Sequence, residues 1–209
     1  MKNVTFIGTG YVGLVSGTGI SDFGHKVICY DISKEKIESL KKSKIPIHEP
    51  GLAELIKKNT GAGRLSFSND PEVAIKDADV IFIAVGTPMG KDGKADLKYV
   101  ESAARTIGKY LNSYTVICTK STVPIGSSKK IINIINESKN DAAAFDYISN
   151  PEFLREGSAL NDFLWPDRVV IGGSSKKSFS VMKEIYGPLF KNKQLIVYTT
   201  VTTAEMIKY

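Results

Sequence analysis

Residues 3–31 read NVTFIGTGYVGLVSGTGISDFGHKVICYD, and this stretch decides the fold class. An apolar run typical of a β-strand, residues 4–7, leads into the glycine turn Gly8-Thr9-Gly10-Tyr11-Val12-Gly13. Small and apolar residues then predict a helix that ends near Gly24, and a second strand-like run ends at Asp31. A strand, a glycine-rich turn, a helix, a strand and an acidic residue in this order indicate a dinucleotide-binding unit.

Each position of this turn suits a phosphate site. Gly8 allows a tight turn after the strand, Gly10 lets the backbone approach a pyrophosphate, and Gly13 lets the helix pack closely on the sheet. The N-terminus of that helix offers N–H groups to phosphates. Asp31 follows Gly13 by 18 positions, where a carboxylate accepts hydrogen bonds from ribose hydroxyls and repels a 2′-phosphate. We therefore expect NAD rather than NADP; a turn that serves packing alone is the competing interpretation.

The composition is that of an ordinary globular protein, with 209 residues, 42% hydrophobic and 24% charged. No apolar run approaches the ~20 residues of a membrane span, and the chain enters a strand pattern at Asn3, so we expect neither a membrane nor a secretory signal. The net charge is +6, but the lysines are scattered, which favours a solvated surface over a nucleic-acid partner.

The cysteine and histidine content predicts a cytoplasmic protein without a metal. Cys29 and Cys118 are the only cysteines, and both lie in predicted strands, which fits reduced thiols better than a disulfide framework. His25 and His48 are the only histidines, and no metal-ligand spacing is present.

Strand-like runs alternate with helical patterns along the rest of the chain. This alternation predicts an α/β, Rossmann-like, doubly wound and mostly parallel sheet with helices on both faces. Expected strands are residues 65–67, 80–85, 114–119, 145–149, 169–171 and 195–198. Expected helices are residues 34–42 after the N-cap Ser33, 52–58, a helix from Pro71 after the N-cap Asp70, 97–111, 129–138, 178–186 and 202–209. Two prolines make residues 45–51 a loop.

Polar motifs follow the ends of four predicted strands. They are Gly8–Gly13, Gly86-Thr87-Pro88, Ser121-Thr122-Val123-Pro124 and Asn150–Glu156. Each motif alone would be read as an ordinary turn. Because ligands bind at the carboxyl ends of the strands in open parallel sheets, their shared position predicts one polar cleft.

Six segments, GTGYVGL, VGTP, STVPIG, NPEFLREGSAL, PDRVVIG and AEMIKY, carry a resemblance to the UDP-glucose/GDP-mannose dehydrogenase family that covers essentially the whole chain. The resemblance implies an NAD-dependent enzyme that oxidises the C6 alcohol of a nucleotide sugar to a carboxylate, by two hydride transfers and a cysteine thioester. The segment LNDFLWPDRVVIG favours UDP-glucose as substrate and UDP-glucuronate as product. GDP-mannose, a related nucleotide sugar, or a non-catalytic NAD-binding module are the alternatives. A 3-hydroxyacid dehydrogenase shares only the first unit, and a short-chain sugar epimerase or reductase would place a glycine where Ile7 stands.

The resemblance also implies residue roles. On the adenosine side of NAD it places Val12, Asp31 and Lys36, together with the glycine-turn residues Gly8, Gly10, Tyr11 and Gly13. Nearer the nicotinamide it places Thr87, Thr122 and Glu156, together with Gly86, Pro88 and Ser121. Substrate contacts are implied for Glu152, Phe153, Leu154, Arg155 and Lys208.

Three of these residues are implied to be catalytic. Glu152 resembles the acid/base residue that handles the water, with the Thr122 hydroxyl nearby, and Lys208 resembles the lysine that stabilises the developing oxyanion at C6. Hydride loss from an alcohol needs a proton acceptor and a positive group beside the oxygen. The structural alternatives are that Glu152 and Glu156 complement a helix dipole, that Lys208 is a solvated lysine, and that Arg168 pairs with Asp162 or Asp167.

The chain departs from the family pattern in two respects, a cysteine and a second domain. The nucleophilic cysteine of the family lies in a glycine-rich motif after AEMIKY, and neither Cys29 nor Cys118 replaces it. We expect residues 1–200 to form the NAD-binding domain and residues 201–209 to begin a helix that links it to a second, UDP-sugar-binding domain absent from this chain. The linking helix implies a homo-oligomer for the full-length enzyme. We expect this chain to bind NAD without completing the oxidation, and steady UDP-glucuronate production by it alone would contradict this.

Overall fold

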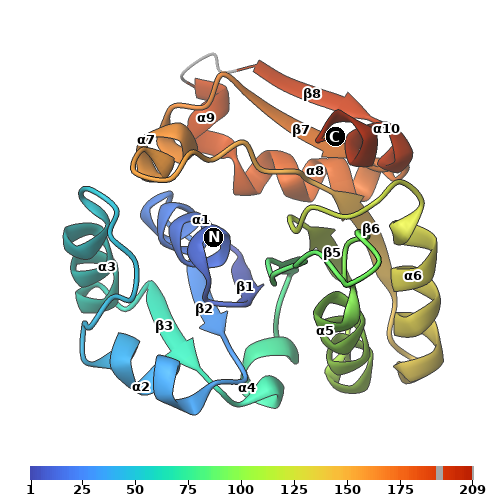
Figure 1. Ribbon diagram of the computed structural model, residues 1–209, viewed down its shortest axis with the longest axis horizontal. Helices are drawn as coiled ribbons and strands as arrows, with labels where there is room; N and C mark the ends of the chain where they lie inside the picture. Colours follow the sequence, from blue (N-terminus) through green and yellow to red (C-terminus); the bar gives the residue numbers. More distant parts are fainter. Residues whose placement is uncertain (192–194, 209) are drawn as a thin grey trace.

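The computed structural model describes residues 1–191 and 195–208, so Tyr209 at the end of the last expected helix lies outside the described residues. Its sheet has the order β3-β2-β1-β4-β5-β6-β7-β8 (Figure 1). The strands are β1 (Asn3–Ile7), β2 (Lys26–Tyr30), β3 (Leu65–Ser68), β4 (Val80–Ile83), β5 (Thr115–Thr119), β6 (Phe145–Ser149), β7 (Arg168–Gly172) and β8 (Leu195–Thr199). The strands from β3 to β6 are parallel, which confirms the predicted mostly parallel α/β sheet.

Among the strands of the described residues, β7 and β8 alone run the other way. β7 pairs antiparallel with β6 through Ser149 and Gly172, and β8 pairs parallel with β7. Since Ser149 and Gly172 are the last residues of their strands, β7 begins beyond the end of β6. The reversed pair therefore projects past the carboxyl edge of the parallel strands, and Arg168 at the start of β7 lies on that side.

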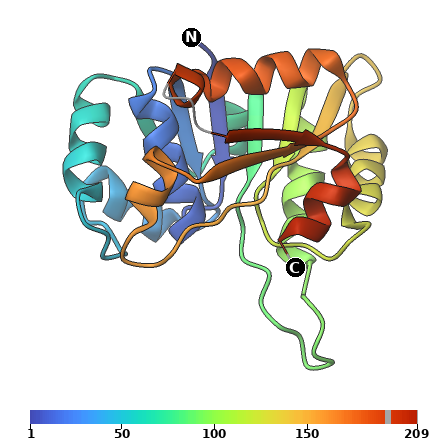
Figure 2. The same ribbon diagram turned by 90° about the horizontal axis from the view of Figure 1, so that it is seen from above.

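Helices cover both faces of the sheet (Figures 1 and 2). One core cluster takes in side chains of α1 (Tyr11–Asp22), α2 (Lys34–Lys41), α3 (Leu52–Gly61), α7 (Ala159–Leu164), α8 (Lys176–Ile185) and α9 (Gly187–Lys191). The other takes in side chains of α4 (Pro71–Ile75), α5 (Lys98–Tyr110) and α6 (Ser127–Ser138). The last helix, α10 (Val201–Ile207), packs against β7 and β6. Residues 86–97 form a loop that extends away from the body of the molecule (Figure 2).

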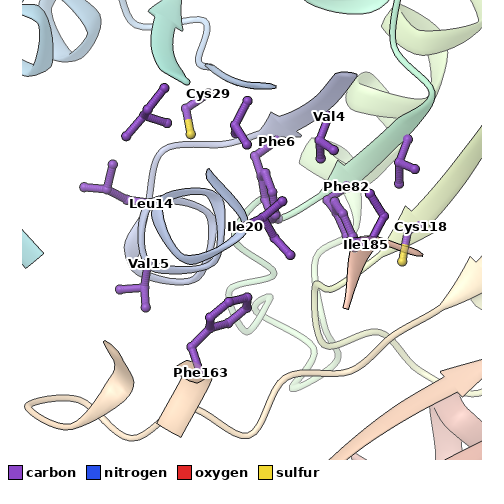
Figure 3. Packing of buried hydrophobic residues seen from close by; sticks show 14 of the residues in the cluster. Val4, Phe6, Leu14, Val15, Ile20, Cys29, Phe82, Cys118, Phe163 and Ile185 are labelled. Carbon is purple, nitrogen blue, oxygen red and sulfur yellow. The ribbon is translucent and has the colours of Figure 1, made fainter. Parts of the chain in front are cut away.

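The central strands are apolar on both sides because each side meets a helical layer. In β1, Val4 and Phe6 belong to the first cluster and Ile7 to the second. The rings of Phe6 and Phe82 stack at 4.6 Å between their centroids, and Figure 3 shows Phe6 beside α1. These contacts fix the register of β1 and β4, and with it the position of the turn that follows β1.

Local signals gave most element ends correctly. The Ser33 hydroxyl accepts from the Lys36 amide and the Asp70 carboxylate from the Glu72 and Val73 amides, so both predicted N-caps are confirmed. Several expectations were wrong: β4 ends at Ile83 rather than Val85, and α3 continues past Lys58 to Gly61. In addition, α6 and α8 each begin two residues earlier than expected, at Ser127 and Lys176, and α7 and α9 were not expected. Residues 84–85 lie against the start of the glycine turn, since the Ala84 amide donates to the Ile7 carbonyl oxygen at 2.9 Å and a Cβ on Gly8 would stand 2.6 Å from the Ala84 carbonyl oxygen.

Candidate cofactor and substrate site

The glycine turn fits a pyrophosphate. Gly8 has a φ of +101°, and a Cβ on Gly13 would stand 1.9 Å from the Gly8 carbonyl oxygen, so close packing requires glycine there. A Cβ on Gly10, in contrast, would meet no described atom within 4 Å. The N-terminus of α1 has no hydrogen bond from a capping side chain among the described residues. The amides of its first turn therefore suit an anion in the open space at Gly10.

Asp31 is held beside this turn at the end of β2. Its Oδ2 accepts hydrogen bonds from the Thr9 amide at 2.9 Å and the Thr9 hydroxyl at 2.8 Å, and its Oδ1 accepts from the Ser33 amide at 3.0 Å. Lys36 Nζ lies 3.8 Å from Oδ2. Burial opposes ionisation, but these hydrogen bonds and the lysine outweigh it and hold the Asp31 pKa below its usual value.

A cavity of about 380 Å³ opens over these groups. Its lining includes Gly8, Gly10, Asp31, Lys36 and Gly86 of the predicted cofactor residues. Ile32 and the α5 residues Tyr99, Ser102 and Thr106 also line it, and sequence reasoning missed them. The exposed Ile32 directly after Asp31 was the one available signal, since an apolar side chain there has no core to enter.

Eight predicted cofactor residues do not line this cavity, and three of them belong to the glycine turn. Gly13 packs against Gly8, Val12 packs against the core, and the Tyr11 hydroxyl is directed to Glu49 at 2.6 Å. The described contacts of these residues therefore support the turn rather than the cavity wall.

The turns after β4 and β5 are tied to each other. The Thr87 hydroxyl donates to the Thr122 carbonyl oxygen at 2.9 Å, and the Ser121 hydroxyl donates to the Val85 carbonyl oxygen at 2.7 Å. Within the described ranges the Thr122 hydroxyl itself makes no hydrogen bond, so it is free to meet a ligand. Pro88 is exposed at the start of the 86–97 loop.

Glu152 and Lys208 form a close charged pair in the site. Lys208 Nζ lies 2.7 Å from Glu152 Oε1 and 2.7 Å from the Glu152 carbonyl oxygen, and Oε2 accepts from the Leu154 amide at 2.7 Å. The side chains are 12% and 23% exposed, respectively, so the pair is partly shielded from water. The Phe153 ring lies beside it, with Lys208 Nζ 5.7 Å and Arg168 Cζ 4.4 Å from the ring centroid.

The buried carboxylate of Glu205 in α10 holds this helix against the start of α6, and Lys208, directly after α10, is thereby placed beside Glu152. Glu205 accepts from the Gly126 amide at 2.7 Å and the Ser128 amide at 2.8 Å, at the N-terminus of α6. The AEMIKY segment thus contacts the STVPIG turn through Glu205 and the NPEFLREG segment through Lys208. Sequence reasoning missed Glu205, because a cap supplied from 77 residues away leaves no local signal.

The other two charged residues of the NPEFLREG segment, Arg155 and Glu156, are not part of the Glu152–Lys208 pair. Arg155 forms a two-point hydrogen bond with Asp162, with Nη2 2.6 Å from Oδ1 and Nε 3.1 Å from Oδ2. Asp162, one of the two partners suggested for Arg168, is therefore already engaged by Arg155, and Arg168 stacks on Phe153. Glu156 is exposed in the turn before α7 and makes no hydrogen bond or ion pair with the described residues.

Sequence reasoning also missed Lys120, which is buried directly after β5. Its Nζ donates to Asn150 Oδ1 at 3.2 Å, and burial lowers its pKa. Asn150 is fixed in turn by the Tyr186 hydroxyl at 2.6 Å and the Val170 carbonyl oxygen at 2.7 Å. Lys120 and Asn150 line a cavity of about 410 Å³ together with Glu152, Phe153 and Arg168.

Neither cysteine is placed for chemistry. Both thiols are fully buried, which raises the pKa of Cys29 to about 12 and that of Cys118 further. A Cβ on Gly17 of α1 would stand 2.6 Å from the Cys29 sulfur, so α1 packs closely over this thiol. Among the described residues, no group of His, Cys, Asp and Glu could hold a metal ion, and no helix is long and apolar enough to cross a membrane.

Known proteins are similar to this chain over its whole length. UDP-glucose 6-dehydrogenase TuaD of Bacillus subtilis is 51% identical over 209 residues, which are 100% of this chain and 45% of that protein. The structure of a UDP-glucose dehydrogenase from Pyrobaculum islandicum superposes with a TM-score of 0.95 at 38% identity, covering 100% of this chain and 48% of that one. GDP-mannose dehydrogenase from Pseudomonas aeruginosa gives a TM-score of 0.92 at 38% identity with the same coverage.

The chain spans about half the length of the curated relatives it matches. The model of one family, described as "UDP-glucose/GDP-mannose dehydrogenase family, NAD binding domain", matches residues 2–190. That match covers the glycine turn, Asp31, the strand-end turns and the NPEFLREG segment in one alignment. This chain therefore belongs to the UDP-glucose/GDP-mannose dehydrogenase family and contains its NAD binding domain.

Proposed function

We propose that this chain supplies the NAD site and part of the acid–base machinery for oxidising UDP-glucose to UDP-glucuronate. The observation that carries the proposal is the Glu152–Lys208 pair, with 2.7 Å between Oε1 and Nζ. This pair lies past the carboxyl ends of the parallel strands, as the glycine turn does. The names of the UDP-glucose 6-dehydrogenases to which the chain is similar support the choice of sugar.

The residues present fit NAD. The open space at Gly10 accepts the pyrophosphate, and the ionised Asp31 accepts hydrogen bonds from the ribose while Lys36 lies at its side. Gly86, Thr87, Pro88, Ser121, Thr122 and Glu156 are proposed for the nicotinamide end. When bound, NAD supplies the hydride acceptor.

Glu152 and Lys208 are proposed to act on the C6 oxygen of the sugar. The Glu152 carboxylate accepts the hydroxyl proton, and the Lys208 ammonium stabilises the negative charge that develops on the oxygen. Both groups work in a partly water-shielded position, where charge stabilisation is stronger than in bulk water. The free Thr122 hydroxyl is proposed to position the water or the sugar oxygen by a hydrogen bond. The nucleotide sugar is proposed to contact Phe153, Leu154 and Arg155.

Calorimetry on the 209-residue chain tests the proposal. We expect NAD to bind, NADP to bind more weakly, and UDP-glucose to bind to the NAD-saturated chain with a Kd in the millimolar range. Phe153→Ala should abolish the sugar-nucleotide heat and leave NAD binding intact. Tyr99→Ala, in the cofactor cavity, is the matched control and should weaken NAD binding instead.

Two results would redirect the proposal. A chain that binds NAD and ignores millimolar UDP-glucose would be a non-catalytic NAD-binding module. Tighter binding of GDP-mannose than of UDP-glucose would favour the second sugar named among similar structures. The domain division at residue 200, a homo-oligomeric assembly and a cytoplasmic location stay predictions.

A further inference from the structure

Glu49 joins three segments that are far apart in the sequence. It lies in the 45–51 loop and is 7% exposed. Its Oε2 accepts from the Tyr11 hydroxyl at 2.6 Å and from the Gly157 amide at 3.0 Å, and its Oε1 accepts from the Leu160 amide at 3.1 Å. One carboxylate therefore connects the first residue of α1 with the turn that leads from the NPEFLREG segment into α7.

The chemistry of these contacts requires an ionised carboxylate. Both oxygens of Glu49 face only donors, and the Gly157 amide also donates to the Tyr11 hydroxyl oxygen at 3.0 Å. Burial disfavours the charged form, but the hydrogen bonds from Tyr11, Leu160 and Gly157 outweigh it and lower the Glu49 pKa. Burial and the bond to Glu49 raise the pKa of Tyr11 to about 12, so the phenol keeps its proton and remains a donor.

The two ends of this connection are functional segments. Tyr11 follows Gly10, next to the space proposed for the pyrophosphate. Gly157 closes the segment that begins at Glu152, and the Arg155 carbonyl oxygen lies 3.1 Å from the Tyr11 hydroxyl as a second acceptor. A displacement of Tyr11 therefore changes hydrogen bonds at both ends of the 155–157 turn.

We propose that Glu49 is a positioning residue that couples NAD binding at the glycine turn to the order of the sugar-binding segment 152–157. The inference rests on the proposed function, which places NAD and the sugar at these two segments. NAD bound at the glycine turn holds Tyr11 in position. The Tyr11 hydroxyl in turn holds the Glu49 carboxylate and the Gly157 amide through hydrogen bonds, and these contacts keep the segment that carries Glu152 in place. By linkage, loss of this connection weakens NAD binding as well.

Two substitutions cut the connection at different points. Glu49→Gln keeps the shape but turns an NH2 group toward at least one N–H donor, which leaves a buried polar group unsatisfied. Tyr11→Phe removes only the hydroxyl and keeps the Glu49 carboxylate with its bonds to the Gly157 and Leu160 amides. A matched tyrosine–carboxylate pair, Tyr114 OH to Asp146 Oδ2 at 2.6 Å, lies at the opposite ends of the strands and supplies the controls Tyr114→Phe and Asp146→Asn.

The experiment combines hydrogen–deuterium exchange with NAD titration on the whole chain. In the wild type we expect NAD to slow amide exchange over residues 152–160. In Tyr11→Phe and Glu49→Gln that NAD-dependent protection should be lost and the NAD Kd should rise about 5-fold or more, while both control variants behave like the wild type. If Glu49→Gln does not fold, the result for Tyr11→Phe alone decides whether the coupling exists.

The coupling is overturned if Tyr11→Phe keeps both the wild-type NAD Kd and the NAD-dependent protection of residues 152–160. It is equally overturned if the wild type binds NAD without any change in that segment, and the proposed function then stands unaffected. Failure of the wild-type chain to bind NAD contradicts the proposed function itself, so the two failures are distinguishable.

Discussion

Lys208 bonds to both the side chain and the main chain of Glu152, with Nζ 2.7 Å from Oε1 and 2.7 Å from the carbonyl oxygen. The two residues are 56 positions apart, one just past α10 and the other in the loop after β6. A single ammonium therefore fixes the orientation of the carboxylate relative to its own backbone. This fixed pair is what the proposed proton transfer needs.

Removal of Lys208 should destabilise the fold more than removal of an exposed lysine. Lys208→Met leaves the Glu152 carboxylate partly buried without its partner, and we expect the free energy of unfolding to fall by about 1–3 kcal/mol. Urea unfolding followed by circular dichroism measures this. Lys41→Met, which breaks the exposed pair with Glu38, is the control and should change stability by less than about 0.5 kcal/mol. Equal effects from the two substitutions would show that the Lys208 pair is an ordinary surface contact.

Asp31 should decide the choice between NAD and NADP. Asp31→Asn removes the negative charge that repels a 2′-phosphate, so the ratio of the NADP Kd to the NAD Kd should fall by about 10-fold or more. Calorimetric titration with both cofactors measures the ratio. Asp141→Asn, at an exposed carboxyl far along the chain, should leave the ratio unchanged, and an unchanged ratio in Asp31→Asn would place the ribose elsewhere.

The stabilisation supplied by Asp31 should disappear in acid. Its folded-state pKa is lowered, so its stabilising contribution is fully present above the unfolded pKa and is lost as the pH falls through the folded value. The difference in Tm between wild type and Asp31→Asn should be constant from about pH 6 to 8 and shrink below about pH 4. Thermal unfolding at a series of pH values checks this. A difference that grew with falling pH would contradict the direction of the shift.

Substitution of two glycines of the same turn should affect different properties, the stability of the fold for Gly13 and the affinity for NAD for Gly10. Gly13→Ala puts a Cβ 1.9 Å from the Gly8 carbonyl oxygen, so we expect a loss of several kcal/mol or failure to fold. Gly10→Ala meets no described atom within 4 Å and should leave Tm nearly unchanged, yet it fills space proposed for the pyrophosphate and should weaken NAD binding about 10-fold or more. Thermal unfolding and calorimetry separate the two effects. Unchanged NAD affinity in Gly10→Ala would move the pyrophosphate away from this turn.

The thiols should be unreactive in the folded chain. Burial raises the pKa of Cys29 to about 12, and Cys118 is shifted in the same direction, so neither forms the thiolate at neutral pH. Iodoacetamide labelling followed by mass spectrometry should modify both cysteines only after urea is added. Rapid labelling of Cys118 in the native state would show that this thiol is reactive and would contradict its exclusion as a nucleophile.

The glycine-turn unit could be read from the sequence because its parts are neighbours along the chain. The strand, the turn and Asp31 fall within residues 3–31, where Gly8 is required by its positive φ and Gly13 by its contact with Gly8. The cap of α7 is different, since Glu49 supplies it from 111 positions before Leu160. No local pattern marks such a cap, and for this reason α7 was not expected.

The sequence by itself determined the α/β class, the N-caps at Ser33 and Asp70, and the acid at the end of β2, because these depend on hydrophobic period, turn chemistry and short spacings. The tertiary structure alone decided that β7 reverses, that Lys208 meets Glu152, and that Tyr11 reaches Glu49. Contacts of this second kind depend on how the helical layers and the strand ends come together, and sequence spacing carries no information about distances across a sheet edge.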